Sequence, residues 1–425
     1  QTVMLDPSGR LLQLSAVPPQ FDPDGAPSDS TAAPWPGLFA AAGLNFAAFT
    51  PVAPQWTPRD YADVRQAWEG PHGDSGKVRV EASSYRGRPV SFAIVPPWWT
   101  RAGPTQAATR PFGDRVAYVL ISLATIALIA GAILLARHNL RARRADAAGA
   151  TRVAVAVSTI ELTAWLFGFQ HLGDVRAEMG SLTVIAGDAV FVGVLLWVAY
   201  IAVEPYVRRF WPDMLLGWSR LLAGHIRDAR VGRDVLLGLG IGVLWLGIEL
   251  ARRLLPQALG YAAMTPRSGG ELNFAGAPCG ACNALSTWSI LAVRQFIPVF
   301  LSLLLFLVLR LGTRSEWKAI ALGGIAIFFW WSNLGSATAF WVEFGAEALA
   351  VALFTAVMIR GGILPALVAM FVVNVCQTVA MTLEVTHWSA TASNMTLALI
   401  VALTVYAFVT ARTGEPLFGR LPSDL

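Results

Sequence analysis

Long apolar runs, separated by short polar loops, occupy the chain from Val116 almost to its C-terminus. A helix needs about 20 apolar residues to cross the hydrocarbon core of a bilayer. Runs of about this length lie at residues 116–136, 153–172, 182–203, 235–254, 286–309, 318–336, 340–359, 363–385 and 395–411. The pattern predicts an α-helical polytopic membrane protein with about nine transmembrane helices, or eight if residues 319–359 form one span and a re-entrant segment.

Residues 1–113 show a different pattern, rich in proline, glycine and serine and without a run long enough to cross a membrane. Asp6-Pro7-Ser8-Gly9 between two short apolar segments predicts a turn that joins two strands. We expect a small α+β extracytoplasmic domain over residues 1–113 and a transmembrane helical bundle over residues 114–425. The elements expected in the small domain are strands at residues 3–5, 10–14, 77–82 and 89–95, and helices at residues 36–46 and 59–68.

Composition agrees with lipid as the main solvent, because 55% of the residues are hydrophobic and only 14% are charged. Soluble domains carry about a quarter charged residues. The net charge of +5 does not indicate a nucleic-acid partner, since the basic residues lie mainly in short loops between apolar runs.

Arginine and lysine gather in alternate loops, those that follow the first, third, fifth, seventh and ninth apolar runs. Such loops are cytoplasmic in inner-membrane proteins. The basic residues are Arg137, Arg141, Arg143, Arg144, Arg152, Arg208, Arg209, Arg220, Arg227, Arg230, Arg233, Arg310, Arg314, Lys318, Arg360, Arg412 and Arg420. We therefore predict a bacterial inner-membrane protein with a periplasmic N-terminal domain and a cytoplasmic C-terminus; a minority of arginines, such as Arg176 and Arg267, falls on the other side.

Residues 204–234 form the longest predicted cytoplasmic connection. Apolar side chains, including Trp211 and Trp218, recur there at spacings of three and four with arginines between them. The spacing predicts an amphipathic helix in the membrane interface, held by apolar burial and by attraction to anionic lipids. The residues expected to contact lipid are Arg208, Arg209, Trp211, Trp218 and Arg220. The alternative is a plain loop with one helical turn.

Charged side chains inside a span cost on the order of 3 kcal/mol each, so they need a partner, water or a function. Ionisable residues within or near the spans are Glu161, His171, Asp188, Glu249, Arg294, Glu343, Glu347, Glu384 and His387. The spacing of four places Glu343 and Glu347 on one helical face, where they could share a proton, bind a cation or pair with an arginine. We predict an intramembrane polar site of Glu343, Glu347 and Arg294, and both a structural salt bridge and a proton or ion path fit this pattern.

Cys279 and Cys282 lie in a predicted periplasmic loop, where their spacing fits a local disulfide. Attachment of c-type haem would require histidine at position 283, which is Asn283, and the loop lacks two further zinc ligands. The glycines at 238, 240 and 242 lie inside an apolar run, so they predict close helix packing rather than a nucleotide-binding loop. We predict no cofactor, no metal site and no catalytic residue.

One segment resembles a known family. The sequence EPYVRRFWPD at residues 204–213, continued by WSRLLAG at 218–224 and VGRD at 231–234, resembles the membrane-embedded C-terminal region of acidobacterial-type receptor-like serine/threonine protein kinases. LDPSGRLL at 5–12 with AVPP at 16–19, and GEPLF at 414–418, extend the resemblance from end to end. It implies a cytoplasmic kinase upstream of Gln1, a first span, an extracytoplasmic domain and this bundle. The chain itself contains no kinase motif, so no catalytic residue is carried over.

Three functions remain open. The resemblance implies a non-catalytic membrane sensor and coupling module, whose periplasmic domain responds to a ligand or to the state of the envelope and whose bundle acts on a cytoplasmic kinase module. The second is an accessory structural subunit of a larger respiratory or photosynthetic membrane complex, in which His171 or His387 could serve as an axial ligand. The third is an intramembrane protease or transporter that uses Glu343 and Glu347. The expected partners are the lipid bilayer with its anionic lipids, and other membrane subunits or a kinase module.

Overall fold

The chain forms two compact units. The computed structural model describes residues 2–6, 9–19, 21, 33–71, 77–95, 112–168, 171, 173–261, 280–331, 340–379, 381–387 and 389–412. The first unit contains Gln1–Ala108 with two short later segments, and the second contains the helices that follow.

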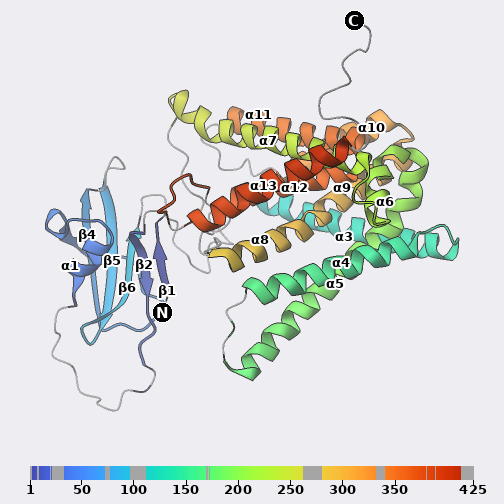
Figure 1. The fold of residues 1–425 in the computed structure, drawn as a ribbon. Coiled ribbons are helices and arrows are strands. Elements are labelled where there is room, and N and C mark those ends of the chain that lie inside the picture. The colour runs from blue at the N-terminus through green and yellow to red at the C-terminus, as the bar shows by residue number, and fades with distance from the viewer. Residues whose placement is uncertain are drawn as a thin grey trace, which may run out of the picture. The chain divides into compact units, whose positions relative to one another are not determined.

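The first unit is built on an antiparallel six-stranded sheet with the order β1-β2-β6-β5-β4-β3 (Figure 1). Its elements are β1 (Thr2–Leu5), β2 (Leu11–Ser15), α1 (Trp35–Ala41), a 3-10 turn (Phe46–Ala48), β3 (Thr50–Val52), β4 (Val64–Pro71), β5 (Lys77–Tyr85) and β6 (Arg88–Val95). Both predicted hairpins are present, β1 with β2 and β5 with β6. In the first turn, the Asp6 carboxylate accepts the backbone N–H of Arg10 at 2.8 Å, and Gly9 adopts φ +80°.

Aromatic rings fill the core between α1 and one face of the sheet. Phe39 of α1 is fully buried, and its ring meets those of Phe49, Trp68 and Phe92 edge to face at centroid distances of 5.1, 5.4 and 5.5 Å. Such edge-to-face pairs add to the stabilisation from apolar burial. Gly70 of β4 is required here, because a Cβ at this position would lie 2.6 Å from the Phe49 ring.

The helix predicted at residues 59–68 is wrong, since this segment runs into β4. Val64 to Pro71 pair residue by residue with β5, from Val64 opposite Ser84 to Pro71 opposite Lys77. The apolar spacing was compatible with a helix, but cross-strand hydrogen bonding and the burial of Trp68 decide the local conformation. The predicted helix at 36–46 exists in a shorter form, since α1 ends at Ala41.

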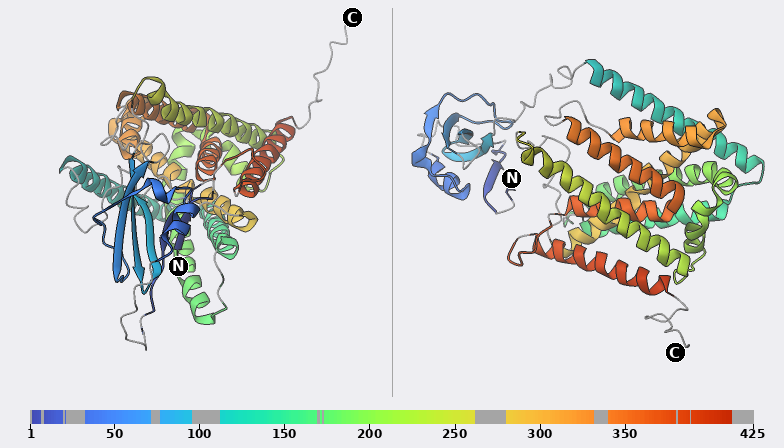
Figure 2. Two further views of the ribbon diagram at one scale, coloured as in Figure 1. Left: turned by 90° about the vertical axis from the view of Figure 1, so that its left-hand side faces the viewer. Right: turned by 90° about the horizontal axis from the view of Figure 1, so that it is seen from above.

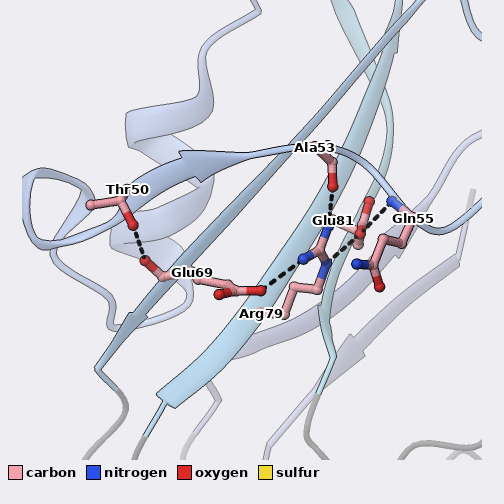
Figure 3. Close-up of polar contacts among 6 residues, drawn as sticks. All are labelled: Thr50, Ala53, Gln55, Glu69, Arg79 and Glu81. Atoms are coloured by element: carbon pink, nitrogen blue, oxygen red, sulfur yellow. Dashed lines mark hydrogen bonds and ion pairs between the residues drawn. The ribbon is translucent and has the colours of Figure 1, made fainter.

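The other face of the sheet carries a polar cluster, drawn in Figure 3. The Arg79 guanidinium donates to Glu81 at 2.6 Å, to Glu69 at 2.7 Å and to the carbonyl of Ala53. Glu81 is 6% exposed and also accepts the backbone N–H of Gln55 at 3.0 Å. Arg79 and Glu81 therefore hold the segment after β3 against the sheet.

The second unit is a helical bundle (Figure 2). Its helices are α3 (Phe112–Arg141), α4 (Ala147–Gly168), α5 (Val175–Phe210), a 3-10 turn (Pro212–Leu215), α6 (Leu216–Leu222), α7 (Ala229–Ala258), α8 (Gly280–Arg294), α9 (Phe296–Thr313), α10 (Glu316–Trp331), α11 (Phe340–Ala356), a π turn (Val357–Gly361), α12 (Ile363–Thr378) and α13 (Ala390–Ala411).

Seven segments of the described chain are long and apolar enough to cross a membrane, with α8 and α9 together forming one of them. Each of the nine predicted runs overlaps a described helix, but α10 and α12 have 16 described residues each, fewer than a full span needs, so nine spans stay a prediction. Ten of the first thirteen residues of α12, including Ile363 and Met370, are buried. A helix that is apolar all round and covered by its neighbours is a core element of the bundle, whether or not it spans the bilayer.

Glycines bring α7 and α12 into close contact, as the sequence predicted. A Cβ at Gly238 would lie 2.7 Å from the Pro365 carbonyl oxygen, and one at Gly242 would lie 2.8 Å from the Val372 Cβ. Gly240 faces open space. Two of the three glycines therefore form a small-residue surface of the kind that permits close helix packing.

The arginine-rich ends of the helices gather at one end of the bundle. The Arg152 guanidinium at the start of α4 donates to the Leu222 carbonyl in α6 at 3.4 Å. The Trp211 indole donates to Glu316 at the start of α10 at 3.3 Å. The basic loops predicted to lie on one side of the membrane thus meet in space, and this end is called the basic end below.

Candidate functional site within the membrane helices

Three ionisable side chains from three helices of the bundle lie close together: Glu161 of α4, Asp188 of α5 and Arg294 of α8. The Arg294 guanidinium lies 3.5 Å from the Asp188 carboxylate, and both side chains are about half exposed. Glu161 is 6% exposed and near enough to both for their charges to act on it. Glu161 lies nine residues, or about 14 Å, along α4 from Arg152, which is close to half the thickness of a hydrocarbon core.

The residues around the cluster explain why α4 and α5 lie together at this level. Along α4, Val153, Val157 and Glu161 are buried at a spacing of four, so they share one face. Ser158, one turn from Glu161, donates its hydroxyl to the Ala189 carbonyl of α5 at 2.8 Å. The opposing position on α5 is Gly193, where the Ser158 hydroxyl occupies the space of a Cβ.

A second glycine brings α4 and α8 together. Gly168, at the end of α4, faces Ser286 of α8, whose hydroxyl fills the space that a Cβ would take. Because Ser286 lies eight residues before Arg294, this contact directs the end of α8 toward the α4–α5 pair. Small residues therefore place the three charged side chains in one cluster.

The helix is interrupted for one residue beside Arg294, between the end of α8 and the start of α9 at Phe296. Pro298 has no N–H, so it cannot donate to the Arg294 carbonyl, while the neighbouring backbone bond from Val299 to Gln295 is kept at 3.3 Å. The Gln295 side chain is buried; it donates to the Leu291 carbonyl at 2.9 Å and accepts from Asn374 of α12 at 3.1 Å. The break is therefore anchored to the core helix α12.

The cluster has an excess of negative charge when all three groups are ionised, with two carboxylates and one guanidinium. Asp188 has its ion pair with Arg294, whereas Glu161 makes no hydrogen bond or ion pair within the described part of the chain. A buried carboxylate in this position is balanced by a proton or by a cation. Chemically, the arrangement can gain and lose one positive charge among three helices.

Within the predicted polar site, the Arg294 guanidinium lies 3.5 Å from the Asp188 carboxylate of α5. A joint site of Arg294 with Glu343 and Glu347 stays a prediction. Glu343 is 5% exposed on α11 and Glu347 is half-buried one turn later. The sequence did identify Glu161 and Asp188 as candidates, but their spacing along the chain contained no signal that α4, α5 and α8 meet.

The two tryptophans predicted to contact lipid in residues 204–234 are buried in protein instead. Trp211 and Trp218 are 6% and 4% exposed, because the turn at Pro212–Leu215 and the short helix α6 fold back onto the bundle core. A seven-residue helix replaces the long amphipathic helix that the spacing predicted. The apolar spacing of this segment therefore reflects burial in protein.

The arginines of the same segment remain at the surface. Arg208 pairs with Glu204, and the Arg209 guanidinium lies 5.6 Å from the centre of the Phe210 ring. The Arg220 guanidinium donates to both carboxylate oxygens of Asp228, at 2.6 and 2.8 Å, and this interaction lowers the pKa of Asp228. The Asp228 carboxylate also caps α7, because it accepts the backbone N–H of Arg230. Their contact with anionic lipid stays a prediction.

Two further expectations have different outcomes. Cys282 is exposed with a free thiol, and Cys279 lies outside the described residues, so the disulfide stays a prediction.

His171 contacts the Glu178 carboxylate at 3.0 Å and the Leu166 carbonyl at 3.1 Å, and the hydrogen bond to Glu178 raises the pKa of His171. Both ring nitrogens are thus engaged by protein groups.

No protein-family model matches the chain, and neither a curated protein nor a solved structure is similar to it. The resemblance to the membrane region of receptor-like kinases rests on the sequence segments alone.

Proposed function

We propose that this chain is a membrane sensor and coupling module, in which the charge state of Glu161 controls how α4, α5 and α8 pack. The observation that carries the proposal is the buried carboxylate of Glu161, without a hydrogen bond, beside the Asp188–Arg294 pair. A switch needs an element with two arrangements whose equilibrium a local charge can bias. In this proposal, the interruption between α8 and α9, which lies next to Arg294, is the element that changes.

The direction of coupling follows from the distribution of arginine. The basic end supports a cytoplasmic location for the loops that meet there, and the sheet domain is then periplasmic in a bacterial inner membrane. The resemblance to receptor-like kinases supports a cytoplasmic protein kinase as the recipient of the signal. In this scheme, a change at the outer surface alters the bundle at Glu161 and reaches the basic end through α4 and α5.

The test follows the position of α8 as a function of pH. The exposed thiol of Cys282 would be labelled with an environment-sensitive fluorophore in a C279S/C376S background, and the protein reconstituted into lipid vesicles. Asp188 and Arg294 are the charged groups that face Glu161 from the helices packed on α4. We expect the fluorescence to change between pH 5 and pH 8 and the change to disappear in Glu161→Gln.

The matched control is Glu384→Gln, which neutralises an exposed carboxylate that lies outside the three helices of the cluster. It should keep the response of the parent protein. An unaltered response in the Glu161→Gln variant would contradict the proposal.

A second function, transport of a proton or cation, is favoured by one observation. Broken helices with charged groups at the break form the binding sites of many transporters, and Arg294 occupies such a break here. Flux measured across the same vesicles separates the two functions. Proton or cation flux that depends on Glu161 would establish transport, whereas a conformational response without flux would support the sensor.

A further inference from the structure

Two adjoining cavities open at the surface between α3 and α5. The first has a volume of about 180 Å³ and an apolar lining from α3, α5 and α9. The second, of about 370 Å³, lies closer to the basic end. Ile133 and Val198 line both, so the two form one continuous groove along α3.

The groove changes chemistry along its length. Its inner part is lined by small or branched apolar side chains, among them Ala132, Val194 and Leu304. Its outer part ends at Arg137 and Arg141, which lie one turn apart on the same face of α3, opposite Trp197. A guanidinium pair above an apolar groove matches the headgroup and tails of a phospholipid.

The two arginines have no carboxylate counter-ion among the residues that the structure describes. Arg137 and Arg141 are exposed and form no ion pair with the described residues. By contrast, Arg208 and Arg220 at the same end of the bundle have carboxylate partners. A lipid phosphate supplies the charge that Arg137 and Arg141 lack, because guanidinium groups bind phosphate oxygens strongly.

The floor of the groove is held in place by the protein itself. The buried Asn139 side chain donates to the carbonyls of Ile201 and Ala202 on α5, at 3.0 and 3.1 Å. Ala132 and Ala136 are 4% exposed and keep α3 close to its neighbours without filling the groove. The site is therefore formed before a ligand arrives.

We propose that this groove binds one anionic phospholipid from the leaflet at the basic end, with its phosphate on Arg137 and Arg141 and an acyl chain along Ile133 and Val194. The proposal is independent of the function of Glu161. Each arginine near a membrane surface contributes attraction to anionic lipid, and two together favour an anionic over a zwitterionic lipid by roughly 30-fold.

The experiment measures retained lipid on the full chain. Protein purified in mild detergent would be exchanged into phosphatidylglycerol or phosphatidylcholine, and bound lipid counted by native mass spectrometry. We expect one retained phosphatidylglycerol, lost in the Arg137→Gln/Arg141→Gln variant. The Arg143→Gln/Arg144→Gln variant, which removes the same charge beyond the groove, should retain it.

A second pair of variants tests the apolar part of the groove. Val194→Trp places a large side chain inside the lining and should reduce retained phosphatidylglycerol at least about tenfold, with the arginines intact. Val184→Trp, at a 70% exposed position ten residues earlier on α5 and outside the lining, should not. Equal retention of both lipids, or loss of selectivity in the Arg143/Arg144 variant as well, would overturn the proposal. Size-exclusion profiles identical to the parent protein confirm that each variant is folded.

Discussion

Close packing of α7 on α12 predicts opposite effects for two neighbouring glycine substitutions. A methyl group at Gly242 would meet the Val372 Cβ at 2.8 Å and the Ala369 carbonyl oxygen at 3.1 Å. A methyl group at Gly240, on the same helix and two residues away, would meet nothing within 4 Å. Gly242→Ala should therefore destabilise the bundle, while Gly240→Ala should be neutral or stabilising.

The magnitude follows from the contacts. Ordinary van der Waals contact begins at 3.4 Å, so α7 and α12 must separate by about 0.6 Å to admit the methyl at Gly242. Overpacking of this kind costs about 1–3 kcal/mol. Alanine in place of glycine in a helix interior contributes up to about 1 kcal/mol of stability at either position. This gain cancels in the comparison, and the difference between the variants is about 1–3 kcal/mol of packing energy.

Thermal unfolding in detergent, followed by loss of the monodisperse size-exclusion peak, measures this difference. With an unfolding entropy of about 2.1 cal/mol/K per residue, a change of 1 kcal/mol shifts Tm by about 1 °C for a chain of 425 residues. We expect Gly242→Ala to melt about 1–3 °C below Gly240→Ala. Equal melting temperatures, or a lower one for Gly240→Ala, would refute the assignment of Gly242 to the α7–α12 contact.

Two further predictions concern other parts of the chain. Arg79→Ala leaves the buried carboxylate of Glu81 without its guanidinium partner and should destabilise the sheet domain by about 3 kcal/mol. Faster proteolysis of that domain measures this loss. The control variant Glu69→Gln changes a side chain that is 43% exposed and should cost less than about 1 kcal/mol. The pKa of Asp228 is lowered by Arg220, so its stabilising contribution is present above the unfolded value of 3.8 and is lost as pH falls through the lower folded value. Asp228→Asn should flatten that acid-side loss in a pH series of melting temperatures.

Helical content and the small domain were predictable because their signals are local. Long apolar runs need only lipid or one another to become helices. The hairpin around Asp6 and Gly9 needs only a side chain that hydrogen-bonds to the turn and a glycine that adopts a positive φ. The close-packing role of Gly238 and Gly242 was also readable, because glycine inside an apolar helix has few other uses.

Local signals failed where two conformations share a pattern. Residues 59–68 satisfied a helical spacing, yet residues 64–68 pair with β5 and form the first part of β4. Trp211 and Trp218 satisfied an amphipathic spacing, but that spacing does not say whether the apolar face meets lipid or protein. The bundle core provided the better partner, and both indoles are buried in it.

Local patterns along the chain were enough to predict lipid-compatible helices, a separate sheet domain, and charged residues that require compensation. Which of these charges meet depends on the packing of the helices. Glu343 and Glu347 were prominent because they are four residues apart, whereas Glu161, Asp188 and Arg294 are far apart in sequence and come together through glycine contacts between helices. Long-range electrostatic partners depend on how helices pack, and that is set by side chains on several helices at once.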